Sequence, residues 1–143
     1  KKKRLNKYEI SEIRIIYLML NYNEAIKTYE KKLGSLIHED MTEFANEIVY
    51  YKDKYKIFDY ASFINYIEEN ENLKKVFEKI TNYNNNTSYN EKELEDYINI
   101  VKEYNIKKRI EELTQQMKET YDIEKKKSIA SKIEKIKKDV LKW

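Results

Sequence analysis

Apolar residues recur along the chain at steps of three and four, the spacing that places side chains on one face of an α-helix. In the segment 9–20 apolar residues point to nearly every side of such a helix. A helix of this kind is typical of the centre of a helical protein, where several neighbours cover it. The same spacing predicts four further short helices, over residues 24–33, 41–55, 60–69 and 73–83.

Residues suited to helix ends stand at most of the predicted boundaries. Asn23, Asp59 and Asn72 each precede a predicted helix, and their side chains can accept hydrogen bonds from the unpaired N–H groups of its first turn. Gly34 follows the second helix and can take the left-handed conformation in which many helices stop. The polar run at 84–88 predicts a loop. The predicted apolar face of the third helix, at three- and four-residue steps, consists of Met41, Phe44, Ala45, Ile48, Val49, Tyr51 and Tyr55.

The pattern changes after residue 90. Nothing interrupts residues 91–121, which predicts one helix about 46 Å long, more than the roughly 30 Å width of a small domain, so one end should project. Its apolar stripe over 94–101 is rotated by about 150° from the stripe over 106–117. The two halves of this helix are therefore expected to pack against different neighbours.

The last segment carries apolar residues at heptad spacing after a short turn at 121–123. It can pack back on the preceding helix as an antiparallel hairpin. The predicted fold is therefore all-α: a multi-helix bundle followed by a long helix leading into a projecting C-terminal hairpin. The predicted hairpin seam consists of Ile106, Ile110, Leu113, Met117, Ile129, Ile133, Ile136 and Val140.

Composition agrees with this all-α prediction and removes many kinds of chemistry. The chain of 143 residues has no proline and one glycine, so the turns of a β-sandwich or barrel would be hard to build. The absence of cysteine excludes disulfides, thiolate zinc sites and cysteine nucleophiles, and a single histidine excludes paired Glu-x-x-His metal sites. We expect no cofactor and no metal.

Charge divides the chain into three parts. Residues 1–4 are predicted to be a basic remnant of a linker, since the chain begins without methionine and is expected to be a piece of a longer protein. Residues 5–104, the predicted bundle, hold 13 Lys and Arg against 19 Asp and Glu, a net charge of −6. Residues 105–143, the predicted hairpin, hold 12 against 7, a net charge of +5. No apolar stretch approaches the roughly 20 residues of a membrane span, and we expect a cytoplasmic protein.

His38 lies beside Ser35, Glu39 and Asp40, which together supply the residue types of a hydrolytic triad. All four fall within six residues of one connector, whereas known triads draw their members from separate elements around a pocket. A histidine at the start of a helix is the better interpretation. Since a single glycine cannot form a phosphate-binding loop either, we expect no enzymatic activity.

Three basic runs, at 107–109, 125–127 and 137–138, could contact a phosphate backbone or merely solvate the outside of the hairpin. Only three arginines occur in the chain, and arginine is the residue that most often reads base edges. Nonspecific nucleic-acid binding stays open, whereas sequence-specific contact is not expected.

Several apolar residues near the hairpin ends are not used by its seam, and a group of them at one end favours partner binding. Lysines around them would steer a partner by charge. The predicted binding residues are Tyr121, Ile123, Leu141 and Trp143, with Lys125, Lys126, Lys127, Lys137 and Lys138 at the rim.

These features together resemble a known family. The opening helix reads EISEIRIIYLML from Glu9 to Leu20, several short helices follow, and the long helix carries Tyr97, Ile98 and Val101 and then KRIEEL from Lys108 to Leu113. From about Leu5 onward the pattern resembles the C-terminal helicase-binding domain of bacterial DNA primase (DnaG). The chain departs from it in being rich in lysine and free of proline.

The resemblance implies a helical bundle and hairpin that dock on the N-terminal domains of the hexameric, DnaB-type replicative helicase. The hairpin would be the principal attachment and the bundle would modulate the helicase, while the zinc-binding and RNA-polymerising domains would lie upstream. The chain is thus predicted to be a non-catalytic module that recruits primase to the replication fork. The alternatives are a nonspecific nucleic-acid-binding domain and a coiled-coil dimerisation module.

Overall fold

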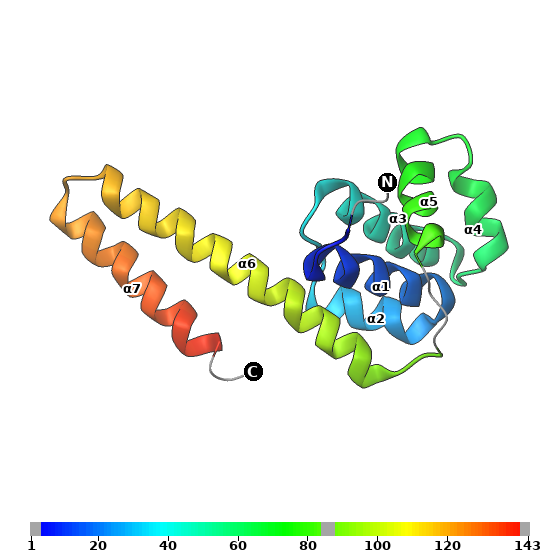
Figure 1. Cartoon of the computed structure of the whole chain (residues 1–143), viewed down its shortest axis with the longest axis horizontal. Helices are drawn as coiled ribbons and strands as arrows, with labels where there is room; N and C mark the ends of the chain where they lie inside the picture. The colour runs from blue at the N-terminus through cyan, green and yellow to red at the C-terminus, as the bar shows by residue number, and fades with distance from the viewer. Residues whose placement is uncertain (1–3, 84–87, 141–143) are drawn as a thin grey trace. The chain divides into compact units, whose positions relative to one another are not determined.

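The computed structural model describes residues 4–83 and 88–140, and within these ranges the chain forms seven α-helices and no strand (Figure 1). The predicted all-α class is confirmed. The predicted linker remnant at 1–4 and the predicted loop at 84–88 lie almost wholly outside the described residues. The helices are α1 (Lys7–Asn21), α2 (Asn23–Lys32), α3 (Glu39–Tyr55), α4 (Tyr60–Ile67), α5 (Glu71–Asn82), α6 (Glu91–Glu119) and α7 (Ile123–Val140).

The chain divides into two compact units, unit 1 over Lys1–Lys102 and unit 2 over Glu103–Trp143. Helix α6 is continuous and contributes residues to both units. The sequence places the division between residues 104 and 105, within the same helix.

Unit 1 is built around α1. Helices α2, α3 and α5 all pack against α1, and α3 also contacts α2 and α5 (Figure 1). Ile13, Ile16 and Met19 of α1 are completely buried, as the apolar residues on every side of this helix predict. The core continues through Phe44 of α3 and Phe63 of α4, whose rings meet edge to face with centroids 5.8 Å apart.

The first part of α6 belongs to unit 1 and is tied to it by two ion pairs. Arg14 of α1 lies 2.9 Å from Glu93, and Lys32 of α2 lies 2.6 Å from Glu95. Burial opposes the charge of Arg14, but its hydrogen bonds to Glu93 and Tyr97 outweigh that effect and raise its pKa. The buried guanidinium group of Arg14 thus has hydrogen-bond partners in place of water.

Helix caps were predicted correctly at some boundaries and wrongly at others. Asp59 caps α4 as predicted, accepting a hydrogen bond from the Ser62 N–H at 2.9 Å. Helix α5 is capped by Asn70 and not by Asn72, because α5 begins two residues earlier than predicted. Asn23 is the first residue of α2 rather than its cap, and the cap position holds Tyr22, which makes no capping hydrogen bond with its side chain.

The connector from α2 to α3 contains Gly34, whose φ of +74° is the left-handed conformation predicted for the end of a helix. Its N–H donates to the Tyr29 carbonyl at 3.0 Å, and Tyr29 itself is fully buried. Tyr55 corrects a prediction, since it is 48% exposed although its spacing places it on the core face of α3. It is the last residue of α3, where neighbouring helices no longer cover that face.

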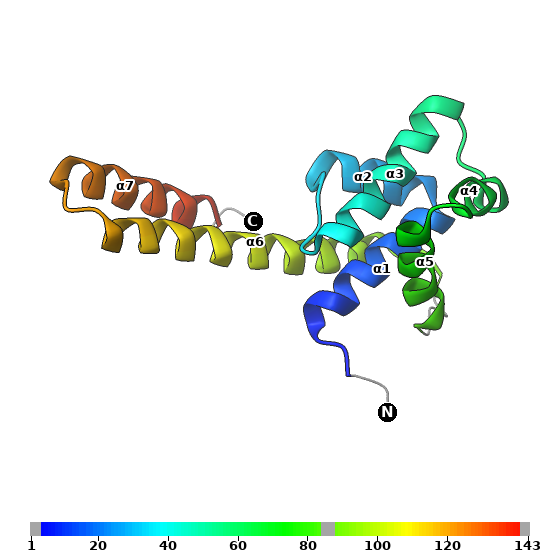
Figure 2. The same cartoon turned by 90° about the horizontal axis from the view of Figure 1, so that it is seen from above.

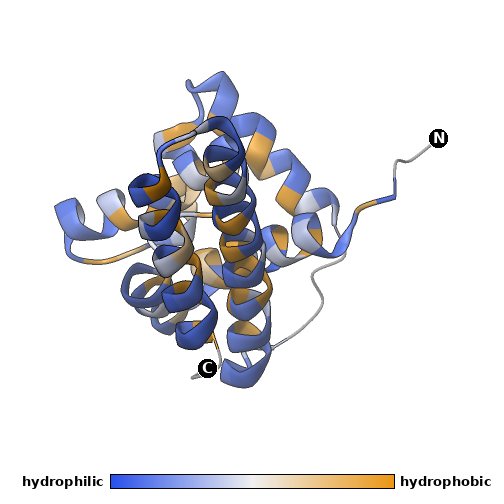
Figure 3. Ribbon diagram, turned by 90° about the vertical axis from the view of Figure 1, so that its left-hand side faces the viewer, coloured by the Kyte–Doolittle hydropathy of each residue, from blue (hydrophilic) through white to orange (hydrophobic). Residues whose placement is uncertain are grey.

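Unit 2 consists of the second part of α6 and of α7, which runs alongside it in the opposite direction (Figure 2). Figure 3 looks toward the α6–α7 turn and shows apolar residues recurring among polar ones along the helices. Leu113 is the only described residue of this unit that is buried, and no residue of α7 is. The other seam residues are half-buried: Ile106, Ile110, Met117, Ile129, Ile133, Ile136 and Val140.

Among the described residues, no helix is long and apolar enough to cross a membrane.

Candidate functional site

The turn between α6 and α7 presents two large apolar side chains to solvent. Tyr121 is 97% exposed and Ile123, the first residue of α7, is 68% exposed. The turn is ordered by Asp122, whose carboxylate accepts hydrogen bonds from the N–H groups of Glu124 at 2.9 Å and Lys125 at 3.3 Å. These contacts form an N-terminal cap for α7. We call Tyr121 and Ile123, with the neighbouring Lys125–Lys127, the tip.

The structure brings some of the predicted binding residues together and separates others. Tyr121, Ile123 and the exposed Lys125–Lys127 all lie within the turn and the first turns of α7. The exposed Lys137 and Lys138 lie about 15 Å further along the same helix at a rise of 1.5 Å per residue. Leu141 and Trp143 lie outside the described residues.

The half-buried seam is a second apolar feature of unit 2. In a pair of helices, each helix has a single neighbour to cover its apolar stripe. Every described seam side chain except that of Leu113 therefore stays partly in contact with water. The half-buried Ile129, Ile133 and Ile136 lie on one stripe of α7 with lysines on both sides of it. A further helix could bury the rest of this stripe.

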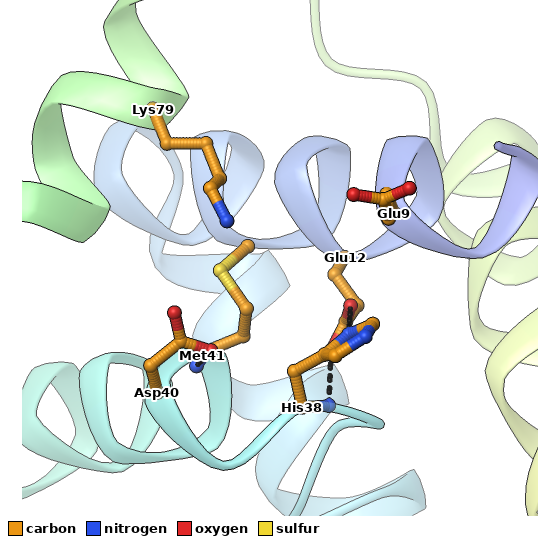
Figure 4. Close-up of a pocket in the computed structure, with 6 residues that line it drawn as sticks. All are labelled: Glu9, Glu12, His38, Asp40, Met41 and Lys79. Atoms are coloured by element: carbon orange, nitrogen blue, oxygen red, sulfur yellow. Dashed lines mark hydrogen bonds and ion pairs between the residues drawn. The ribbon is translucent and has the colours of Figure 1, made fainter. Parts of the chain in front are cut away.

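His38 lies in a different environment from the one a triad requires. A small pocket of about 100 Å³ is lined by Glu9, Glu12, His38, Asp40, Met41 and Lys79 (Figure 4). Ser35 does not line it. Glu12 Oε1 lies 2.5 Å from His38 Nδ1, and Glu12 Oε2 accepts the N–H groups of Ile37 at 2.9 Å and His38 at 2.8 Å.

These contacts give Glu12 a structural role. Its side chain is 1% exposed, and both its oxygens are used to hold the α2–α3 connector against α1. The carboxylate also places negative charge at the start of α3, where the helix dipole favours it. His38 is thus a residue of the helix start, and in residues 4–83 and 88–140 no three His, Cys, Asp or Glu side chains group as metal ligands would.

Two features of potential function were missed in the sequence. The Asp122 cap was missed, although an Asp next to an apolar heptad pattern is a recognisable helix-start signal. The other is a group of exposed tyrosines on α3 and α4: Tyr50, Tyr55, Tyr60 and Tyr66. The spacing of these tyrosines does not predict their exposure, because exposure depends on which neighbouring helices cover that face.

Comparisons of the chain with protein-family models, with curated proteins and with solved structures find no match. The features that bear on function are therefore those of the molecule itself: an ordered turn with two exposed apolar side chains, a half-buried seam, and lysines along α7.

Proposed function

We propose that this chain is a non-catalytic interaction module of bacterial DNA primase that binds the N-terminal domains of the hexameric, DnaB-type replicative helicase. It would recruit primase to the replication fork and modulate helicase activity. In this proposal unit 1 is the helical bundle and unit 2 the helical hairpin of that family. The sequence resemblance suggests the partner, and the surface chemistry of unit 2 supports attachment there.

The observation that carries the proposal is the exposure of Tyr121 and Ile123 on an ordered turn. Neighbouring large apolar side chains that are exposed together are typical of a binding surface, and interface energy concentrates in a few such residues. Because Asp122 holds the turn, little conformational entropy would be lost when it binds.

The half-buried seam supports the same attachment. Helices of the helicase N-terminal domain could cover the exposed part of the Ile129, Ile133 and Ile136 stripe. Lysines beside that stripe would act mainly on the rate of association and its dependence on salt, since they stay at the solvated rim.

The test is binding of the whole chain to the replicative helicase of the same organism, measured by calorimetry. Ile123→Asp should weaken binding by about 30-fold, the loss of about 2 kcal/mol typical of an interface anchor. An aspartate at the start of α7 also agrees with the helix dipole, so helix content should not fall. Ser131→Asp, an exposed change of equal charge on the same helix, is the matched control and should bind almost normally.

Three outcomes would contradict the proposal. The chain could fail to bind the helicase, or both aspartate variants could bind equally well. It could also bind duplex DNA tightly at physiological salt, in which case nonspecific nucleic-acid binding would be the better interpretation.

A further inference from the structure

The excess positive charge of unit 2 lies on α7. Residues 123–140 hold seven lysines against three Asp and Glu, a net charge of +4. The part of α6 in this unit, residues 103–119, holds four Lys and Arg against four Asp and Glu, so its net charge is zero. The positive charge of unit 2 is therefore concentrated on α7, in which no described residue is buried.

The lysines of α7 line both edges of its apolar stripe. We call the half-buried Ile129, Ile133 and Ile136 the α7 stripe. Successive residues of an α-helix are rotated by about 100°, so Lys132 lies about 70° to one side of the centre of this stripe and Lys137 about 70° to the other. Both lysines are exposed. A partner that covers the stripe from either side therefore meets lysines.

The carboxylates of α7 lie away from the stripe. By the same rotation Glu124 and Glu134 are more than about 120° from its centre, and Asp139 is about 90° from it. Within residues 4–83 and 88–140, no carboxylate lies within ion-pair distance of a lysine of α7. The positive edges of the stripe are thus not neutralised by the described part of the chain.

Lysine edges beside an apolar stripe favour one kind of partner. A phosphate backbone would use the lysines alone, and the half-buried isoleucines would gain nothing from it. A helix with an apolar stripe of its own would bury these isoleucines, and carboxylates beside that stripe would lie opposite the lysines. A basic helix would place like charges opposite one another, which opposes binding.

We propose that the α7 stripe binds an acidic amphipathic helix, whose apolar side chains pack on the stripe and whose carboxylates lie opposite the lysines at its edge. The inference rests on the proposed function only for the identity of the partner. In the helicase, that partner is a surface helix of the N-terminal domain with Asp or Glu beside an apolar stripe. The lysines stay at the solvated rim, so they select the partner by speeding association with an acidic helix and opposing a basic one.

The test uses a designed helical peptide with an apolar heptad stripe, made in two forms. The forms differ only at the positions beside that stripe, which hold glutamate in one and lysine in the other. Binding of each form to the whole chain is measured by fluorescence polarisation at low salt. The glutamate form should bind at least tenfold more tightly, and this preference should shrink when salt reaches a few hundred millimolar.

Two double variants separate the edges of the stripe from the general charge of α7. The edge variant, Lys132→Glu with Lys137→Glu, should bind the glutamate peptide at least tenfold more weakly and should prefer the lysine peptide. The far-side variant, Lys135→Glu with Lys138→Glu, makes the same change of charge at least about 130° from the stripe and should lose less than about threefold. Each pair alters one lysine in mid-helix and one in the last turn, so effects on helix stability are matched, and circular dichroism checks this.

The outcomes separate this inference from the proposed function. Equal binding of the two peptides, equal losses in the two double variants, or tighter binding of duplex DNA than of either peptide would overturn the inference. If the helicase binds the edge and far-side variants equally well, the inference fails and the proposed function stands. If the glutamate peptide binds as expected and the helicase does not bind at all, the proposed function fails and the inference stands.

Discussion

The two units are made from the same kind of amphipathic helix, yet only unit 1 has a hydrophobic core that is shielded from water. Every helix of unit 1 contributes buried apolar side chains, including Leu94, Ile98 and Val101 from its part of α6. In unit 2 the seam is equally regular, but among its described residues only Leu113 is buried. The difference shows that periodicity sets which face of a helix is apolar, whereas the number of neighbouring helices sets how much of it is buried.

The largest effect is expected when the two units are made as separate fragments. Residues 5–104 should fold alone and melt cooperatively, because their core is complete without unit 2. A peptide of residues 103–143 should lose most of its helix content, since short helices without a core are marginal in water. Circular dichroism of both fragments measures this. A stable, cooperatively melting 103–143 fragment would contradict this prediction, because the half-buried seam would then be enough to stabilise the two helices without unit 1.

Matched truncations in the two units should differ in cost. Phe44→Ala removes a fully buried ring of unit 1 and should lower the free energy of unfolding by about 3 to 5 kcal/mol. Ile133→Ala shortens a half-buried side chain of unit 2. It should lower the free energy of unfolding by only about 1 kcal/mol, because less apolar surface is buried there. Urea denaturation of the whole chain compares them. Equal losses would mean that unit 2 is better packed than its exposure indicates.

Glu12→Ala tests how the α2–α3 connector is held in unit 1. It removes the acceptor for the N–H groups of Ile37 and His38 and should cost about 2 to 3 kcal/mol, the penalty for losing a buried charged hydrogen-bond partner. Glu43→Ala, an exposed change on α3, serves as the control and should be nearly neutral. If the two variants unfold at the same urea concentration, Glu12 does not organise the connector.

The smallest effect concerns pH. Hydrogen bonds from Ser62 lower the pKa of Asp59, so the folded state favours the carboxylate. This contribution to stability is present at neutral pH and is lost as pH falls through the lowered pKa. The difference in melting temperature between the unmodified chain and Asp59→Ala should therefore be small at pH 7 and smaller still near pH 3. A difference that grows on acidification would contradict this.

Local sequence signals predicted much of the fold. The positions of all seven helices follow from apolar spacing, and Asp59 and Gly34 act as predicted. Asn70 and Asn72 are alike in type and two residues apart, and spacing alone favoured the wrong one as the cap of α5. Such errors of one or two residues are inherent where neighbouring residues have the same capping ability.

Contacts between distant segments were not predictable in the same way. The bonds from Glu12 to Ile37 and His38 join residues 25 and 26 positions apart, and nothing in the local pattern of either segment requires them. Tyr55 has the spacing of a core residue and is exposed. Of the candidate site, the exposed Tyr121 and Ile123 were predicted from their places off the seam. The exposure of the tyrosines on α3 and α4 was not predicted.

Helix α6 also bears on the order in which the chain can fold. Asn90 accepts hydrogen bonds from the N–H groups of Lys92 at 2.9 Å and Glu93 at 3.2 Å, which caps the helix inside unit 1. The costly first turn of a helix is thereby formed against an existing core, and further turns add easily because no glycine or proline follows. We therefore expect unit 1 to nucleate α6, so that on a ribosome this helix forms before α7 has been synthesised.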